Sequence, residues 1–436
     1  MELEEIDLNS SEQENVDHSS KPPESFPIVT GTMHYNDFFR HYLETNTPCL
    51  IRADAVMKSW PSCTDWVDSE NQVPCLEYFK NLLNADEYNV PVSNCGKKFF
   101  NCQEKCDMPF GAFLRYWNDI KQCQKSNIYY LKDWHFVKEF PQYKAYRTPS
   151  FFSSDWLNEY LDYVEDNVLS QAFNNSDYRF VYAGPKDSWT PLHADVFGSY
   201  SWSANVIGEK EWIFFPPGYE KYLINPDNKE MMYDIYEVLP FDEKYSFQCK
   251  SFNYDGHAIL YYKVRQKTNE IIFVPSGWYH QVKNIENTIS INHNWFNASN
   301  IQKIWNILQD ELKKVEQEIR DCKNSCKDKK EWNDMCQNLL RANHGMNVEE
   351  FLDLCIYIAR KRITSIDNAD AFVSYDGYKH GQTHLVYDTK ILKDILSQID
   401  REHAISRDVT KIINEIDVVL STRLNLNNEI NSVLSG

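Results

Sequence analysis

The central part of the chain, from about residue 178 to residue 296, is built of short apolar runs separated by turn residues. The runs are rich in β-branched and aromatic residues, and they read YRFVYAG, SYSWSANVIG, EWIFFPPG, AILYYKV, EIIFVPSG, QVKNI and TISINHNWF. Gly, Pro, Asn and Asp lie between them. This pattern predicts antiparallel strands arranged as a barrel or as two packed sheets, a fold that can hold one small ligand in its interior.

The segments on either side have a different periodicity. Residues 26 to 175 mix apolar runs with helical patterns, such as Phe113, Leu114 and Trp117, so this part is expected to be mixed α and β. After Asn297, apolar residues recur at steps of three and four, which predicts a helix from Ile301 to Ile319. Further amphipathic segments lie at about 330–342, 347–361, 388–400 and 408–420. Residues 364–386 are rich in Asp, Tyr, Gly and His and are expected to form a long connecting loop.

These differences in residue pattern divide the chain into three regions. Residues 1–25 are polar and acidic, and such a composition buries too little apolar area to offset chain entropy, so we expect a disordered tail. Residues 26–300 are expected to form the catalytic domain with an N-terminal elaboration, and residues 301–436 a helical C-terminal region.

Composition and charge narrow the possible partners. The formal net charge is −19, from 45 Lys and Arg against 64 Asp and Glu, so the average field disfavours direct contact with nucleic acid or an anionic membrane surface. A basic protein substrate would be attracted, although a solvated acidic surface explains the same charge. The oligomeric state does not follow from the sequence.

The N-terminal residues resemble no secretory signal, and no apolar run is long enough to span a membrane, which predicts a cytoplasmic protein with possible nuclear access. The 12 cysteines are then expected to be thiols. Cys95, Cys102 and Cys106 cluster loosely, and plain thiols are favoured over a zinc site because no Cys-x-x-Cys pair is present.

The candidate chemistry lies in two short motifs of the strand-rich region. His193 and Asp195 are two residues apart, so in an extended segment they point to the same face. Taken alone, this pair does not indicate a metal site, because a histidine with a structural role explains it better. The run IIFVPSGWYHQV adds His280 at the start of another strand. Two imidazoles and one carboxylate on a β scaffold are typical of non-haem Fe(II) oxygenases, whose remaining metal positions accept a 2-oxo acid and dioxygen.

The two motif blocks resemble the JmjC (jumonji C) oxygenases, and the hydroxylase branch rather than the multidomain histone demethylases. The resemblance covers about residues 27–300 through WTPLHADVFGSYSWSANVIGEKEWIFFPPG and IIFVPSGWYHQVKNIENTISINHNWF. It implies an α+β fold with a double-stranded β-helix (jelly-roll, cupin-like) core. It also implies that His193, Asp195 and His280 bind Fe(II), and that 2-oxoglutarate and dioxygen are cosubstrates.

The resemblance assigns further residues to 2-oxoglutarate. Lys210 would pair with its distal carboxylate, and strand alternation agrees, because Lys210 would then share the inward face of Trp212. A surface lysine is the alternative. Three further residues match positions that bind the cosubstrate in the family: Tyr130, Thr190 and Asn292. Strict strand alternation puts Thr190 on the opposite face from His193, unless Pro191 interrupts the alternation. Relatives often have Thr in place of Asn292. Some have Asn in place of Ser203, and Asn205 could share that face.

Two other histidines are weighed separately. His293 could orient a metal ligand from behind, but a core histidine is the favoured interpretation. His257 follows the turn residues Asp255 and Gly256 and is interpreted as a loop residue.

The likeness is strongest to a branch whose activity is lysyl hydroxylation of the translation termination release factor, and the resemblance implies that reaction and that protein partner. Two alternatives stay open. One is an Nε-methyl-lysine demethylase that uses the same iron chemistry, although no paired-cysteine chromatin-reading module accompanies the core. The other is a non-catalytic cupin-like scaffold that binds partners through its C-terminal helices.

Overall fold

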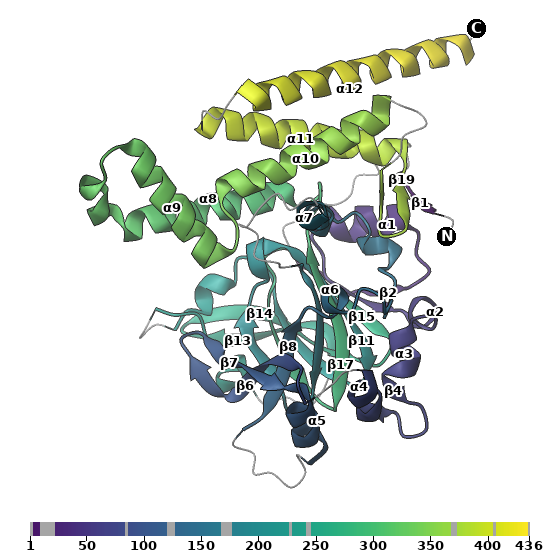
Figure 1. The fold of residues 1–436 in the computed structure, drawn as a ribbon, viewed down its shortest axis with the longest axis vertical. Coiled ribbons are helices and arrows are strands. Elements are labelled where there is room, and N and C mark those ends of the chain that lie inside the picture. The colour runs from purple at the N-terminus through teal and green to yellow at the C-terminus, as the bar shows by residue number, and fades with distance from the viewer. Residues whose placement is uncertain are drawn as a thin grey trace.

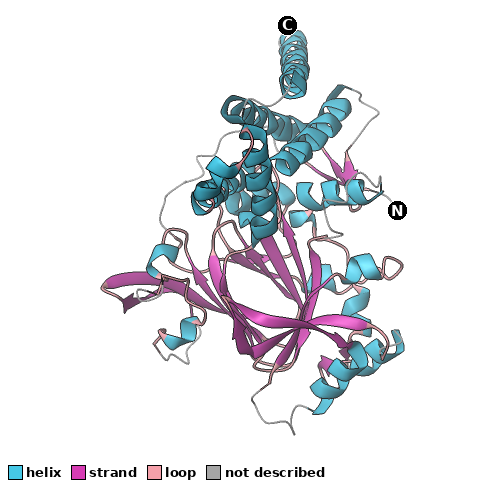
Figure 2. Ribbon diagram, turned by 60° about the vertical axis from the view of Figure 1, so that its left-hand side comes forward, coloured by secondary structure: helices cyan, strands magenta, loops and turns pink. Residues whose placement is uncertain are grey.

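Two β-sheets face each other at the centre of the protein (Figure 2). The computed structural model describes residues 3–8, 22–82, 86–119, 127–166, 177–225, 229–240, 246–367, 373–403 and 407–434. The larger sheet has the order β2-β3-β15-β11-β17-β9-β8-β6-β7. Its strands are β2 (Ile28–Thr30), β3 (Cys49–Arg52), β15 (Glu270–Val274), β11 (Tyr200–Ile207), β17 (Thr288–Trp295), β9 (Arg179–Gly184), β8 (Tyr129–Trp134), β6 (Asn89–Phe99) and β7 (Cys102–Pro109).

The smaller sheet has the order β10-β16-β12-β14-β13. Its strands are β10 (Trp189–His193), β16 (Tyr279–Asn284), β12 (Lys210–Phe215), β14 (His257–Gln266) and β13 (Ser246–Tyr254). Along the chain, β9, β11, β15 and β17 belong to the larger sheet, whereas β10, β12, β14 and β16 belong to the smaller one. This arrangement is the predicted double-stranded β-helix, and every pair among these eight strands is antiparallel.

The strand β11 shows how the sequence positions an internal cavity. Its residues alternate, so Trp202 and Ala204 point to one face and Ser203 to the other. The apolar face packs outward, where Trp202 stacks on Phe152 with ring centroids 5.4 Å apart and also lies against Trp60. The polar face therefore points into the space between the two sheets, which can hold a polar ligand.

The N-terminal elements cover the outside of the larger sheet and extend it at its edges. Residues of these elements, many of them aromatic, make up most of the core cluster that includes Trp202. The helices are α1 (Tyr35–Phe38), α2 (Asp54–Met57), α3 (Pro61–Asp65), α4 (Leu76–Leu82), α5 (Phe110–Asp119), α6 (Phe136–Glu139) and α7 (Trp156–Asp166), and the small strands β4 (Val67–Asp68) and β5 (Val73–Pro74) pair with each other. The predicted mixed α and β character of this region is confirmed.

The C-terminal region is helical, as predicted, and forms a layer beside one end of the sheets (Figure 1). Its helices are α8 (Ile301–Glu318), α9 (Lys329–His344), α10 (Val348–Asp367), α11 (Gln382–His403) and α12 (Arg407–Leu434). Gly345 caps α9 in the left-handed conformation with φ 90°, which ends the helix there. The apolar faces of these helices share one buried cluster with α7.

Two predictions about the less regular segments are wrong. Residues Glu4–Ile6 form the strand β1 instead of disordered chain, and the buried side chain of Ile6 explains why this short segment is held. Residues 9–21 lie outside the described part. The expected loop at 364–386 begins with the end of α10 and contains the hairpin of β18 (Ser374–Tyr375) and β19 (Tyr378–His380), and β1 pairs parallel to β19.

None of the helices in the described ranges has the length and apolar composition needed to cross a membrane.

Candidate active site

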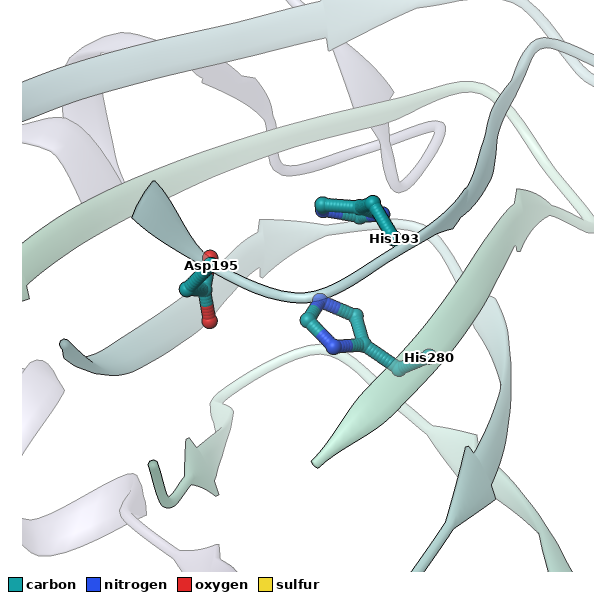
Figure 3. A group of neighbouring side chains, drawn as sticks. All are labelled: His193, Asp195 and His280. Atoms are coloured by element: carbon teal, nitrogen blue, oxygen red, sulfur yellow. The ribbon is translucent and has the colours of Figure 1, made fainter. Parts of the chain in front are cut away.

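Two neighbouring strands of the smaller sheet bring three metal-ligand side chains together (Figure 3). His193 ends β10 and lies directly opposite His280 on the antiparallel strand β16. Asp195 follows two residues after His193. One ligand atom from each of these three residues lies within 4.8 Å of those of the other two. Among the described residues, no other group of three or more His, Cys, Asp and Glu side chains meets this condition. The convergence predicted from the sequence is therefore present.

Backbone carbonyls set the tautomers of both imidazoles. Nδ1 of His193 lies 2.8 Å from the carbonyl oxygen of Pro191, and Nδ1 of His280 lies 3.0 Å from that of Trp278. A carbonyl oxygen only accepts hydrogen bonds, so each Nδ1 carries the proton and each Nε2 keeps a free lone pair for a metal ion. Burial and the neighbouring His280 lower the pKa of His193 to about 3, which keeps this ring neutral near pH 7.

The third ligand is fixed from two directions. The hydroxyl group of Ser201, on β11, donates a hydrogen bond of 2.7 Å to Oδ2 of Asp195. Two residues after Asp195, the buried ring of Phe197 packs into the core of the C-terminal helices, against His344 among others, with ring centroids 5.5 Å apart. Phe197 has φ 61°, a left-handed conformation that is unfavourable for a bulky residue and that this packing holds. The helical region thus positions a metal ligand.

A cavity of about 610 Å³ opens beside the three ligands. Lys210 lines it from β12 and is 1% exposed. Its Nζ donates hydrogen bonds to Oγ of Ser290 at 2.7 Å and to the hydroxyl of Tyr130 at 3.4 Å, and it forms no ion pair with an acidic residue in the part of the chain that the structure describes. Burial, and then the charge of Lys132, lower the pKa of Lys210 to about 7. The interpretation of Lys210 as a surface lysine is wrong.

The other residues assigned to 2-oxoglutarate divide into two groups. Tyr130, Thr190 and Asn292 line the same cavity as Lys210, and so does Ser203, whose buried hydroxyl has no hydrogen-bond partner among the described residues. The strand register shifts between Thr190 and His193, so the break in alternation at Pro191 is present and both side chains reach the cavity.

Asn205 stands apart from the predicted group. It does not line the cavity, and its buried amide donates a hydrogen bond of 2.6 Å to the carbonyl oxygen of Gly208 in the turn before β12. The side chain of Asn205 therefore stabilises the local turn, a contact that strand alternation does not predict.

The two separately weighed histidines are not part of the site. His293 points to the opposite face of β17 from Asn292, hydrogen-bonds the hydroxyl of Tyr146 and packs on Trp202, as expected of a core histidine. His257 is exposed and is the first residue of β14, directly after the predicted turn, instead of a loop residue.

Sequence reasoning missed several residues that shape this cavity. Lys132 and Asp133 line it from β8, and Asp177 lines it from the segment just before β9. Tyr130 was predicted to reach the site, and Lys132 is two residues further along the same strand, so alternation was the signal that pointed to it. Ser201 had the same signal through its spacing from Ser203.

The residues present fit an iron ion and 2-oxoglutarate. Two neutral imidazoles and a carboxylate are the donor set of the facial triad, and a buried ammonium without an acidic partner suits a ligand carboxylate. His193, Asp195 and His280 would hold the metal ion, and Lys210 the distal carboxylate. When bound, these two groups would supply the electrons that activate dioxygen for the oxidation of a C–H bond, while the protein orients them and limits the access of water.

Comparison with known proteins agrees with this geometry. Residues 35–302 match the family model of the cupin-like domain. A protein from Danio rerio named 2-oxoglutarate and iron-dependent oxygenase JMJD4 is 40% identical over 77% of this chain and 75% of its own length. The Drosophila melanogaster homolog of the same name is 36% identical over 90% of this chain and 92% of its own. A protein from Arabidopsis thaliana named arginine-specific demethylase JMJ20 is 42% identical over 73% of this chain and 66% of its own.

The jelly-roll core, the triad and the buried lysine together define a cupin-like oxygenase that depends on iron and 2-oxoglutarate. The extent of identity with the animal proteins makes the assignment narrower: this chain belongs to the JMJD4 family of JmjC oxygenases.

Proposed function

We propose that this oxygenase hydroxylates a lysyl side chain in a protein, and that the protein is the translation termination release factor. The observation that supports a hydroxylase activity is the cavity. Its lining includes the three metal ligands and Lys210, which forms no ion pair with an acidic residue in the described chain. The release-factor target is supported by the sequence resemblance, and the net charge of −19 suits a basic target segment. Such a target would place the protein in the cytoplasm.

A protein substrate is further supported by the surface beside the cavity. Phe99 and Phe100 lie at the turn between β6 and β7, and they are 58% and 82% exposed. The residues that follow, Asn101, Cys102 and Gln103, line the cavity. Exposed aromatic pairs are costly in water and are typical of surfaces that contact a polypeptide. We infer that an apolar side chain of the substrate packs here while the target side chain enters the cavity.

Mass spectrometry of the target tests the reaction. The purified protein is incubated with Fe(II), 2-oxoglutarate, air and the release factor, and the digested product is analysed. The expected result is a gain of one oxygen atom on one lysine, which requires all three additions and is lost in the variant His280→Ala. Turnover of 2-oxoglutarate with no modified lysine in the release factor would refute the target. A modified residue of another type would refute lysyl hydroxylation.

Demethylation is the second candidate, because the relative named arginine-specific demethylase is 42% identical to this chain. Oxygen insertion at an N-methyl group leads to loss of that methyl group, so the same site could act on a methylated cationic side chain. Parallel reactions with unmodified, Nε-methylated lysyl and methylated arginyl peptides of one sequence separate the candidates. Loss of methyl groups without oxygen gain on the unmodified peptide would favour demethylation.

A further inference from the structure

Lys132 reaches the cavity from a bulge in β8. Leu131 pairs with Ala183 of β9 and Trp134 pairs with Val181. Between these two pairs, β8 therefore has one more residue than β9. The extra residue lies at Lys132 and Asp133, and Asp133 has φ 59°. A bulge next to an active site commonly redirects a side chain. Here both residues of the bulge, Lys132 and Asp133, line the cavity.

The bulge is held by Asp133 and not by Lys132. The carboxylate of Asp133 accepts hydrogen bonds from Nζ of Lys105 at 2.6 Å and from the hydroxyl of Tyr182 at 2.8 Å. Nζ of Lys132 makes no hydrogen bond and no ion pair with any residue in the described ranges. The charge of Asp133 attracts the Lys132 ammonium group, but burial still lowers the pKa of Lys132 on balance. A buried ammonium group with no hydrogen-bond acceptor indicates a hydrogen-bonding partner that comes from outside the chain.

No acidic residue of the cavity is available to be that partner. The three that line it are Asp133, Asp177 and Asp195. The carboxylate of Asp133 already accepts hydrogen bonds from Lys105 and Tyr182. Asp177 is bound by Nδ1 of His135 at 2.5 Å and by Nε of Arg179 at 3.1 Å. Asp195 is held by Ser201 and directed at the metal position. None of these carboxylates accepts a hydrogen bond from Lys132, so an anionic ligand is the partner that best fits it.

The position of Lys132 indicates which anion this is. Lys132 lines the same cavity as the buried Lys210 and the metal ligand His193. It therefore borders the space between the metal position and Lys210, where a 2-oxo acid would lie. Two ammonium groups that form no ion pair with an acidic residue of the described chain match a dianion, and Lys210 is the deeper of the two.

We propose that Lys132 is a second cationic binding residue for 2-oxoglutarate and contacts the carboxylate next to the 2-oxo group. This role rests on the cosubstrate of the family and not on the identity of the protein target.

Two ligands that differ only at the distal end test the proposal. 2-Oxoglutarate and 2-oxopentanoate have the same chain length, but the second lacks the distal carboxylate. Their dissociation constants are measured by calorimetry on Fe(II)-loaded protein without oxygen and without protein substrate. Lys132→Met is expected to weaken both ligands by a similar factor, about tenfold or more. Lys210→Met is expected to weaken 2-oxoglutarate alone, and Lys132→Arg to restore part of the lost affinity.

Lys186 provides a matched control, because it is exposed and does not line the cavity. Lys186→Met removes the same charge from the protein and is expected to leave both constants unchanged. Equal binding of 2-oxoglutarate to the wild type and Lys132→Met would overturn the proposal. So would a loss confined to 2-oxoglutarate, since Lys132 would then act on the distal carboxylate.

Thermal unfolding of the metal-free protein separates binding from folding. Burial lowers the pKa of Lys132 in spite of the charge of Asp133, so the ammonium group destabilises the empty protein on balance. Lys132→Met is therefore expected to unfold at the same temperature as the wild type or higher. A clearly lower unfolding temperature in the metal-free state would make Lys132 a structural residue and overturn the proposal. Because these measurements use no protein target, a wrong target would leave them unaffected.

Discussion

The hydrogen bond from Ser201 to Asp195 gives a direct way to test how the metal centre is organised. The substitution Ser201→Ala removes only the hydroxyl group that donates a hydrogen bond of 2.7 Å to Oδ2 of Asp195. A hydrogen bond to a charged group contributes about 1.5 to 3 kcal/mol, and partners that hold metal ligands typically change metal affinity by about 10- to 100-fold. We expect Fe(II) to bind the variant more weakly by a factor in this range.

The assay is a titration of the metal-free protein with Fe(II) in the absence of oxygen, followed by a titration with 2-oxoglutarate at saturating iron. The first affinity is expected to fall in Ser201→Ala and the second to stay close to that of the wild type. Ser201→Thr keeps a hydroxyl group and should recover most of the iron affinity. Ser251→Ala, at an exposed position of β13, is the matched control. Unchanged iron affinity in Ser201→Ala would refute the view that this hydroxyl orients the carboxylate.

Three other substitutions give independent checks. Because the pKa of Lys210 is lowered to about 7, its charge is lost as pH rises through that value, so affinity for 2-oxoglutarate should fall from about pH 6 to about pH 8. In Lys210→Arg this trend should vanish in calorimetry, and a trend that persists would assign it to another group. Phe197→Ala should destabilise the protein by about 3 to 5 kcal/mol in denaturant unfolding and weaken iron binding, whereas unaltered iron affinity would separate the helical region from the metal site. Phe100→Ser should raise KM for the protein substrate several-fold and leave KM for 2-oxoglutarate unchanged; equal KM values for the protein substrate would contradict a docking role.

The strands of the core and the metal ligands could be predicted because their signals are local. Apolar runs separated by turn residues mark each strand, and the spacing of His193 and Asp195 in an extended segment already places both side chains on one face. His280 follows a Pro-Ser-Gly turn at the start of β16, where register sets it opposite His193. These features depend on neighbours in sequence or on one strand pair.

The remaining features depend on contacts between distant segments. The strand β1 exists because the hairpin of β18 and β19 offers it an edge, and three residues carry too little pattern to predict this pairing. The hairpin itself had a signal that was overlooked, since Asp376-Gly377 is a typical two-residue turn. The bulge of β8 at Asp133 and the packing of Phe197 against the C-terminal helices both arise from tertiary contacts, which no periodicity reports.

The arrangement of charges in the cavity connects the cosubstrate with the nature of the target. Each acidic residue that lines the cavity already has a partner or points to the metal, whereas neither Lys132 nor Lys210 forms an ion pair with an acidic residue in the described chain. An empty cavity of this kind repels a cationic side chain, because two ammonium groups lie near the place that it would enter. A bound dianion matches both lysines and removes that repulsion. We therefore expect the proposed lysyl target to bind productively only after 2-oxoglutarate has neutralised these two lysines.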